Sequence, residues 1–96
     1  MTKDWRLERL EEQEFLHGIR LRHALYRQYS PCWDHDHCAG CWAKFSEHED
    51  EREPTLSEGY TTCSDFEHGS EYWWVCPECF LLFKDVMRWS EVANSP

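Results

Sequence analysis

The chain has 96 residues, of which 41% are hydrophobic and 30% charged, and its formal net charge at pH 7 is −9. A chain of this length suits one domain whose apolar core alone is only marginally stabilising, so an additional stabilising element is expected. No apolar run approaches the roughly 20 residues that cross a bilayer, and residues 1–10 are charged where a signal peptide is apolar. We therefore expect no membrane association and a cytoplasmic location.

The negative charge is concentrated in the later part of the chain. Residues 1–29 carry six basic and five acidic side chains, whereas residues 30–96 carry four basic and fourteen acidic ones. Such a surface repels phosphate backbones, so we do not expect nucleic acid as a partner. We expect a basic protein instead. The acidic run at residues 47–58 is the surface expected to bind such a partner, and the alternative is that this run only keeps the protein soluble.

The first part of the chain predicts a helix followed by a strand. Residues 3–16 place apolar side chains at helical spacing among Glu and Arg, and Thr2 or Asp4 can cap the start. Gly18 can end this amphipathic helix. In residues 19–29 apolar side chains alternate with arginines, which predicts an edge strand, with continuation of the helix as the alternative.

The middle of the chain predicts short strands and a charged loop. Residues 42–45 can form a short strand, and every side chain in residues 47–53 is charged or His, which predicts a solvated loop. Residues 59–62 and 72–75 are rich in β-branched and aromatic side chains. They predict a hairpin whose strands are joined by a polar segment.

The end of the chain predicts a second helix. Pro77 suits a first helical position, and the acid Glu78 beside it is favourable at a helix N-terminus. Apolar residues at helical spacing then extend the expected helix to about Glu91. Residues 92–96 are expected to form a flexible tail.

Two Cys-x-x-Cys pairs predict one structural Zn²⁺ bound by four thiolates, those of Cys38, Cys41, Cys76 and Cys79. Gly40 supplies the backbone freedom that a tight cysteine turn needs. Two disulfides or a redox-active pair are alternatives, but a reducing cytosol disfavours disulfides. A thioredoxin-like pair also requires an alternating β and α chain, which is absent here.

A second metal site is conceivable but not favoured. Its ligands would come from Cys32, His35, Cys63 and His68, whose spacings permit a site without being diagnostic. The preferred interpretation is that the two cysteines are small buried apolar side chains and the histidines are surface or supporting groups. His37 is expected to hydrogen-bond a zinc-bound thiolate.

The order of these features resembles that of a treble-clef zinc finger. In both, a cysteine turn and a β-hairpin precede a helix that carries the last two ligands. We therefore expect a small α+β zinc domain with a β-hairpin or small antiparallel sheet between an N-terminal and a C-terminal helix. Its parts are residues 1–30 with the first helix and strand, a zinc core at residues 31–91, and the tail.

The sequence does not predict an enzyme. Residues 34–37 (DHDH) resemble the Asp-His pair of HNH nucleases, but here the pair precedes the first cysteine pair instead of lying on the hairpin. Zinc deaminases resemble His-x-Glu followed by Pro-Cys-x-x-Cys, and this chain has no upstream His-x-Glu. A nuclease-like enzyme is one alternative. A nucleic-acid-binding zinc finger is another, although the last helix offers only Lys84 and Arg88.

Three sequence blocks are similar to those of a family of small uncharacterised bacterial zinc-binding proteins: residues 34–45 (DHDHCAGCWAKF), 58–60 (EGY) and 74–84 (WVCPECFLLFK). In size and acidity such proteins resemble the immunity proteins encoded beside bacterial toxins. The resemblance implies a protein-interaction module, such as an inhibitor of a basic partner.

Two adjacent tryptophans provide a further expectation. Trp73 and Trp74 fall in one predicted strand, so their side chains should lie on opposite faces. Either the outward one is exposed for partner contact, or the N-terminal helix covers that face with Trp5, Leu10 and Phe15.

Overall fold

The computed structural model describes residues 4–28, 30–33, 35–48, 52–67 and 69–92. The fold is a small α+β domain, as expected. The elements follow in the order α1 (Trp5–Glu12), the short 3-10 helix η1 (Glu14–Leu16), β1 (Arg20–Leu25), β2 (His35–His37), β3 (Lys44–Ser46), β4 (Thr55–Leu56), β5 (Glu58–Thr62), β6 (Trp74–Val75), α2 (Pro77–Phe83) and β7 (Ser90–Val92).

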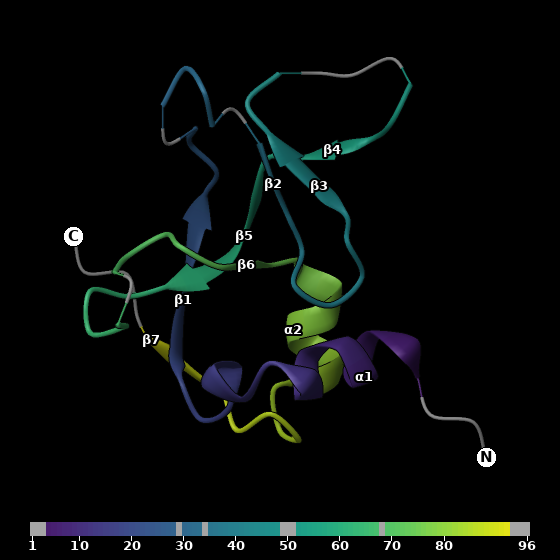
Figure 1. Ribbon diagram of the computed structural model, residues 1–96, viewed down its shortest axis with the longest axis vertical. Helices are drawn as coiled ribbons and strands as arrows, with labels where there is room; N and C mark the ends of the chain where they lie inside the picture. Colours follow the sequence, from purple (N-terminus) through teal and green to yellow (C-terminus); the bar gives the residue numbers. More distant parts are fainter. Residues whose placement is uncertain (1–3, 29, 34, 49–51, 68, 93–96) are drawn as a thin grey trace.

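The strands form two small mixed sheets (Figure 1). The larger sheet has the order β6-β5-β1-β7, in which β1 is antiparallel to β5 and parallel to β7. The smaller sheet has the order β2-β3-β4, with only its last pair parallel. An isolated bridge between Cys38 and Trp74 connects the sheets, where the Ala39 amide donates to the Trp74 carbonyl at 2.9 Å. The expected antiparallel arrangement is therefore correct only for part of each sheet.

Helix α1 begins where the sequence predicted a cap. The Asp4 carboxylate accepts a hydrogen bond from the Arg6 amide at 3.0 Å, which satisfies one of the free amides of the first turn. The helix ends at Glu12, and η1 continues the expected segment to Leu16. Thr2 and the residues beside it lie outside the described part of the chain.

The strand expected within residues 19–29 is confirmed as β1, but its predicted edge position is wrong. Strand β7 pairs along β1, with Arg20 opposite Ser90 and Arg22 opposite Val92, so β1 is internal. Its entry point is Gly18, which has a φ of +70° and donates its amide to the Met87 carbonyl at 2.9 Å. The C-terminal segment therefore covers the edge that the sequence left open.

The expected extension of the second helix to Glu91 is also wrong, because α2 ends at Phe83. Turns follow, and Arg88 adopts a left-handed conformation with a φ of +57°, which a helix does not accommodate. The chain then gains sheet pairing as β7. Val92 belongs to this strand, and residues 93–96 of the expected tail lie outside the described residues.

The predicted hairpin is confirmed, since β5 and β6 pair antiparallel with Tyr60 opposite Val75. The short strand expected at residues 42–45 is shifted to Lys44–Ser46, because Trp42 still belongs to the turn and has a φ of +69°. Of the expected charged loop, residues 49–51 lie outside the described part. No helix in the described ranges has the length and apolar character required to cross a bilayer.

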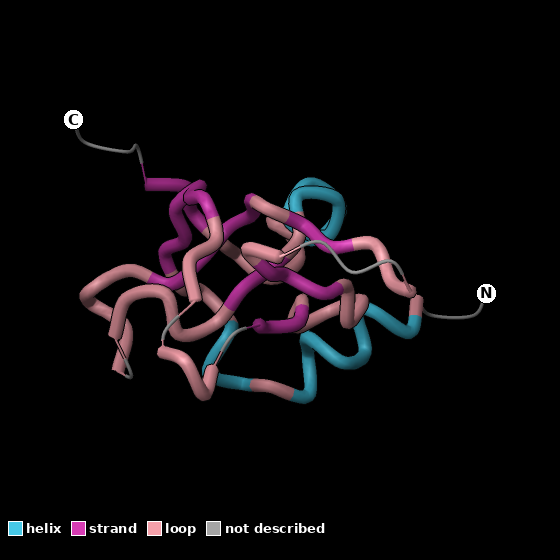
Figure 2. The backbone as a smooth tube through the Cα atoms, turned by 90° about the horizontal axis from the view of Figure 1, so that it is seen from above, coloured by secondary structure: helices cyan, strands magenta, loops and turns pink. Residues whose placement is uncertain are grey.

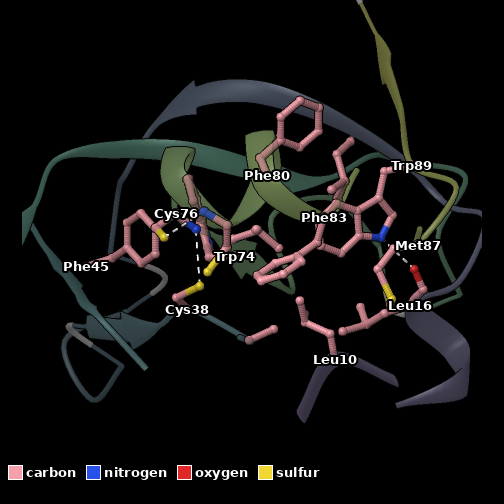
Figure 3. Close-up of a cluster of buried hydrophobic side chains, with 14 of the residues drawn as sticks. Leu10, Leu16, Cys38, Phe45, Trp74, Cys76, Phe80, Phe83, Met87 and Trp89 are labelled. Atoms are coloured by element: carbon pink, nitrogen blue, oxygen red, sulfur yellow. Dashed lines mark hydrogen bonds between the residues drawn. The ribbon is translucent and has the colours of Figure 1, made fainter. Parts of the chain in front are cut away.

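Both helices and both sheets contribute to one apolar core (Figure 3). Helix α2 stands upright in Figure 1 and is seen end-on in Figure 2, whereas α1 lies crosswise beneath it. The Trp89 indole donates to the Leu16 carbonyl at 2.7 Å, which allows this polar ring to be buried. The largest fully buried side chains include Trp74, Phe45, Phe80, Leu10, Leu16 and Leu21.

The adjacent tryptophans lie in different environments, but the strand predicted to hold both is shorter than expected, since β6 contains Trp74 and Trp73 lies just before it. Trp74 is only 1% exposed. Trp73 is partly buried and packs against Phe15 of η1 at a ring distance of 5.3 Å. The N-terminal segment therefore covers Trp73, as one of the two expectations proposed. Of the three side chains expected to do so, only Phe15 does, since Leu10 enters the core and Trp5 is 55% exposed.

Candidate metal centre

The fold brings the two cysteine pairs together. Cys38 follows β2, Cys41 lies in the turn before β3, Cys76 caps α2, and Cys79 lies in the first turn of that helix. Their four sulfur atoms all lie within 4.8 Å of one another. Among the described residues, this is the one group of three or more His, Cys, Asp or Glu side chains placed to share an ion.

The spacing of the sulfur atoms fits a tetrahedral metal. A zinc–sulfur bond of about 2.3 Å places sulfur atoms about 3.8 Å apart in a tetrahedron. The Sγ atoms of Cys41 and Cys76 are 3.5 Å apart. A disulfide requires about 2.05 Å, and all six cysteines are free thiols. The four cysteines therefore form a cluster that is compatible with one zinc ion.

Backbone amides donate to two of the sulfur atoms. The amides of Gly40 and Cys76 donate to the Cys38 sulfur at 3.4 and 3.3 Å, and the Cys79 amide donates to the Cys76 sulfur at 3.4 Å. The contact between Cys38 and the α2 terminus is visible in Figure 3. Such donors favour the thiolate, which is the form of cysteine that binds metals.

The thiols have unequal acidities because they hydrogen-bond one another. Hydrogen bonding from Cys41 lowers the pKa of Cys38 to about 7, and hydrogen bonding with Cys38 and Cys79 lowers the pKa of Cys76 to about 4. The pKa of Cys41 is raised chiefly by its hydrogen bond with Cys38, and the pKa of Cys79 is raised chiefly by its hydrogen bonds with Cys38 and Cys76. The cluster thus favours negative charge on two sulfur atoms, which suits a cation.

Gly40 connects the cysteine turn to the first helix. A Cβ at this position would lie 3.2 Å from the Cys79 sulfur and 3.2 Å from Cδ1 of Leu10. Glycine therefore permits the close approach of the turn to α2 and to the buried leucine of α1. Through this contact α1 packs on the turn that carries Cys38 and Cys41.

His37 has a different role from the expected hydrogen bond to a thiolate. Its ring stacks on the Trp42 indole, with ring centres 4.1 Å apart and planes 2° from parallel. The Arg9 guanidinium lies over the other ring of this pair, 5.1 Å from the Trp42 centre. Burial lowers the pKa of His37. The histidine therefore supports the position of Trp42, whose backbone belongs to the cysteine turn.

The residues considered for a second metal site are not gathered into one in the described part of the chain. Cys32 is exposed and Cys63 is partly buried, so the expectation that both are buried apolar side chains is wrong for Cys32. His35 is exposed, as expected of a surface histidine. His68 lies outside the described residues.

One carboxylate has an environment that the sequence did not indicate. Asp36 accepts hydrogen bonds from the Tyr26 hydroxyl at 2.8 Å and the Trp33 indole at 3.1 Å. Burial raises the pKa of Asp36, and these two hydrogen bonds act in the opposite direction. Its sequence context suggested only a nuclease-like motif, because no local pattern links it to Tyr26 ten positions earlier.

No protein-family model matches this chain, and comparison with curated proteins and with solved structures gives no match.

Proposed function

We propose that this protein binds one structural zinc ion through Cys38, Cys41, Cys76 and Cys79. The observation that carries the proposal is that four sulfur atoms from two distant cysteine pairs lie within 4.8 Å of one another. Four sulfur ligands complete a tetrahedral zinc site and leave no position for water or substrate. We therefore infer a structural and non-catalytic role for the ion.

The domain that this ion organises is, in our proposal, a protein-interaction module for a basic partner. The formal charge of −9 supports this, because an acidic surface attracts basic proteins and repels nucleic acids. Exposed aromatic side chains, which are frequent at binding hot spots, also support it; Trp33 is 41% and Trp42 is 54% exposed. An acidic inhibitor such as a bacterial immunity protein is the class of protein proposed.

The metal assignment is tested by elemental analysis of the purified protein. We expect one zinc per chain, and replacement by Co²⁺ should give the visible absorption of a tetrahedral thiolate complex. Two zinc ions per chain would require a second site that includes Cys32, His35, Cys63 or His68. A thiol-reduced protein that binds no zinc when zinc is supplied would refute the proposal.

The interaction role is tested by affinity capture from cells of the source organism, followed by mass spectrometry. We expect a basic protein whose binding weakens steeply as salt is raised, because exposed charges are screened at high ionic strength. Protein stripped of metal by a chelator serves as the matched control. Recovery of nucleic acid in place of a protein would contradict the proposed role and favour the zinc-finger alternative.

A further inference from the structure

Two adjoining cavities open beside β2, with volumes of about 260 Å³ and about 470 Å³. Trp33, Asp36 and Tyr72 line both cavities, so these three side chains stand where the cavities meet. We name the two cavities together the aromatic pocket. The smaller cavity is below the range of about 300–1,000 Å³ that is usual for a drug-sized ligand, so it suits a single side chain.

Aromatic rings form most of the lining of the smaller cavity. Trp33 and Tyr72 meet nearly edge to face with ring centres 6.3 Å apart, and Tyr72 contacts Trp73 in the same way at 5.8 Å. His37 and Trp42 also line this cavity, but their rings stack on each other and the Arg9 guanidinium lies over Trp42. Electron-rich faces of Trp and Tyr attract organic cations.

A carboxylate at the junction of the two cavities supplies the opposite charge. Asp36 is partly buried, and within the described residues both of its hydrogen bonds fall on Oδ2, which leaves Oδ1 for a ligand. The donors are a hydroxyl and an indole, and among the described residues no arginine, lysine or histidine forms an ion pair with this carboxylate. A partly buried carboxylate that is not in an ion pair is well suited to receive a cation from a partner.

We propose that the aromatic pocket binds a cationic side chain, arginine or lysine, of the basic protein partner. The cationic group would lie next to Asp36 and the aliphatic stem against Trp33 and Tyr72. This inference rests on the proposed interaction role and specifies the part of the surface that performs it. Arginine gains most from such a site, because its planar guanidinium stacks on aromatic faces and donates to a carboxylate at the same time.

Other ionisable side chains line both cavities. His35 and His37 line the smaller cavity and act electrostatically on Asp36, and further charges line the wider cavity. Glu71 and Arg27 both line it, and both are exposed. The Glu71 carboxylate is already in an ion pair with Arg22 at 3.8 Å, so it adds little attraction for a cation, whereas Arg27 opposes it. Removal of the Arg27 charge should therefore strengthen cation binding, an effect that a purely structural role for this region would not produce.

The test uses three capped tripeptides on the full zinc-loaded chain: Gly-Arg-Gly, Gly-Lys-Gly and Gly-citrulline-Gly. Citrulline has nearly the shape of arginine without its charge. Binding is followed by NMR through the Trp33 indole N–H resonance, which reports on the bond to Asp36. We expect millimolar binding of at least one cationic probe and at least about tenfold weaker binding of the citrulline probe.

Variants identify the site. Asp36→Asn should weaken binding of the cationic probe about tenfold, and Arg27→Gln should strengthen its binding about twofold. Glu91→Gln is the matched control, because it removes one negative charge from an exposed position on β7 that lines neither cavity. Zinc content and thermal unfolding show whether each variant is folded. If Asp36→Asn does not fold, Tyr72→Ala takes its place, because Tyr72 also lines both cavities and this change keeps the Trp33 reporter; a similar loss of binding is expected.

Equal binding of the arginine and citrulline probes, or equal effects of Asp36→Asn and Glu91→Gln, would overturn the proposal. These outcomes can be distinguished from a failure of the proposed protein-interaction role. If Asp36→Asn captures the cellular partner as well as the unaltered chain does, the domain still binds a basic protein and only the pocket is wrong. A zinc-free or partnerless protein would instead refute the proposed function.

Discussion

Removal of the metal by a strong chelator is expected to abolish the folded state of this domain. The apparent free energy of structural zinc binding in small zinc domains is about 10–16 kcal/mol. Small domains have a total stability of only about 5–15 kcal/mol. The loss of the metal therefore removes as much free energy as the fold has, and the cooperative thermal transition should disappear.

The positions of the ligands explain why the loss would extend through the whole domain. The cysteine turn joins β2 to β3, Cys76 and Cys79 begin α2, and the buried Leu10 of α1 packs against Gly40 between them. Release of the metal separates three elements that meet at this point. It also leaves several thiols crowded at one buried place, two of which favour negative charge.

Near-ultraviolet circular dichroism and tryptophan fluorescence measure this outcome, because the fully buried Trp74 lies in the core. Addition of excess zinc to the chelated protein should restore both signals, which separates metal loss from oxidation of the thiols. A chelated, reduced and metal-free protein that keeps its original melting temperature would show that the apolar core suffices.

The sequence was informative where a local pattern determines the structure. The Asp4 cap, the start of α2 at Pro77 and the β5–β6 hairpin depend on neighbouring residues, and all are present. The four-cysteine cluster could also be predicted from the sequence, because two Cys-x-x-Cys pairs strongly restrict the kind of site that they can form. Each of these features depends on few residues of characteristic type.

The sequence-based predictions were wrong where pairing between distant segments determines the structure. Residues 84–91 have a helical apolar pattern, yet residues 90–92 pair with β1 in parallel, a contact between segments about 70 positions apart. That same pairing turned β1 from an edge strand into an internal one. The exposure of Cys32 and the hydrogen bonds of Asp36 are further consequences of tertiary placement, which spacing along the chain does not encode.

The substitution Cys79→Ser is expected to be far more damaging than Cys63→Ser. Cys79 is fully buried, lies in the first turn of α2 and belongs to the four-cysteine cluster. Serine at this position replaces a soft thiolate with a hydroxyl that binds zinc poorly, and it leaves a polar group in the buried core. We expect loss of most of the bound zinc and destabilisation by at least about 3 kcal/mol.

Cys63 provides the matched control because it is a cysteine of the same chain outside the cluster. It follows β5, is partly buried, and has a pKa raised by burial, which is typical of an unreactive thiol. Serine here should change the stability by less than about 1 kcal/mol and leave zinc at one per chain. Zinc analysis and urea unfolding of both variants, prepared under reducing conditions, measure the difference. If both variants lose zinc equally, Cys63 must be a ligand, and the set of four cysteines assigned to the metal is wrong.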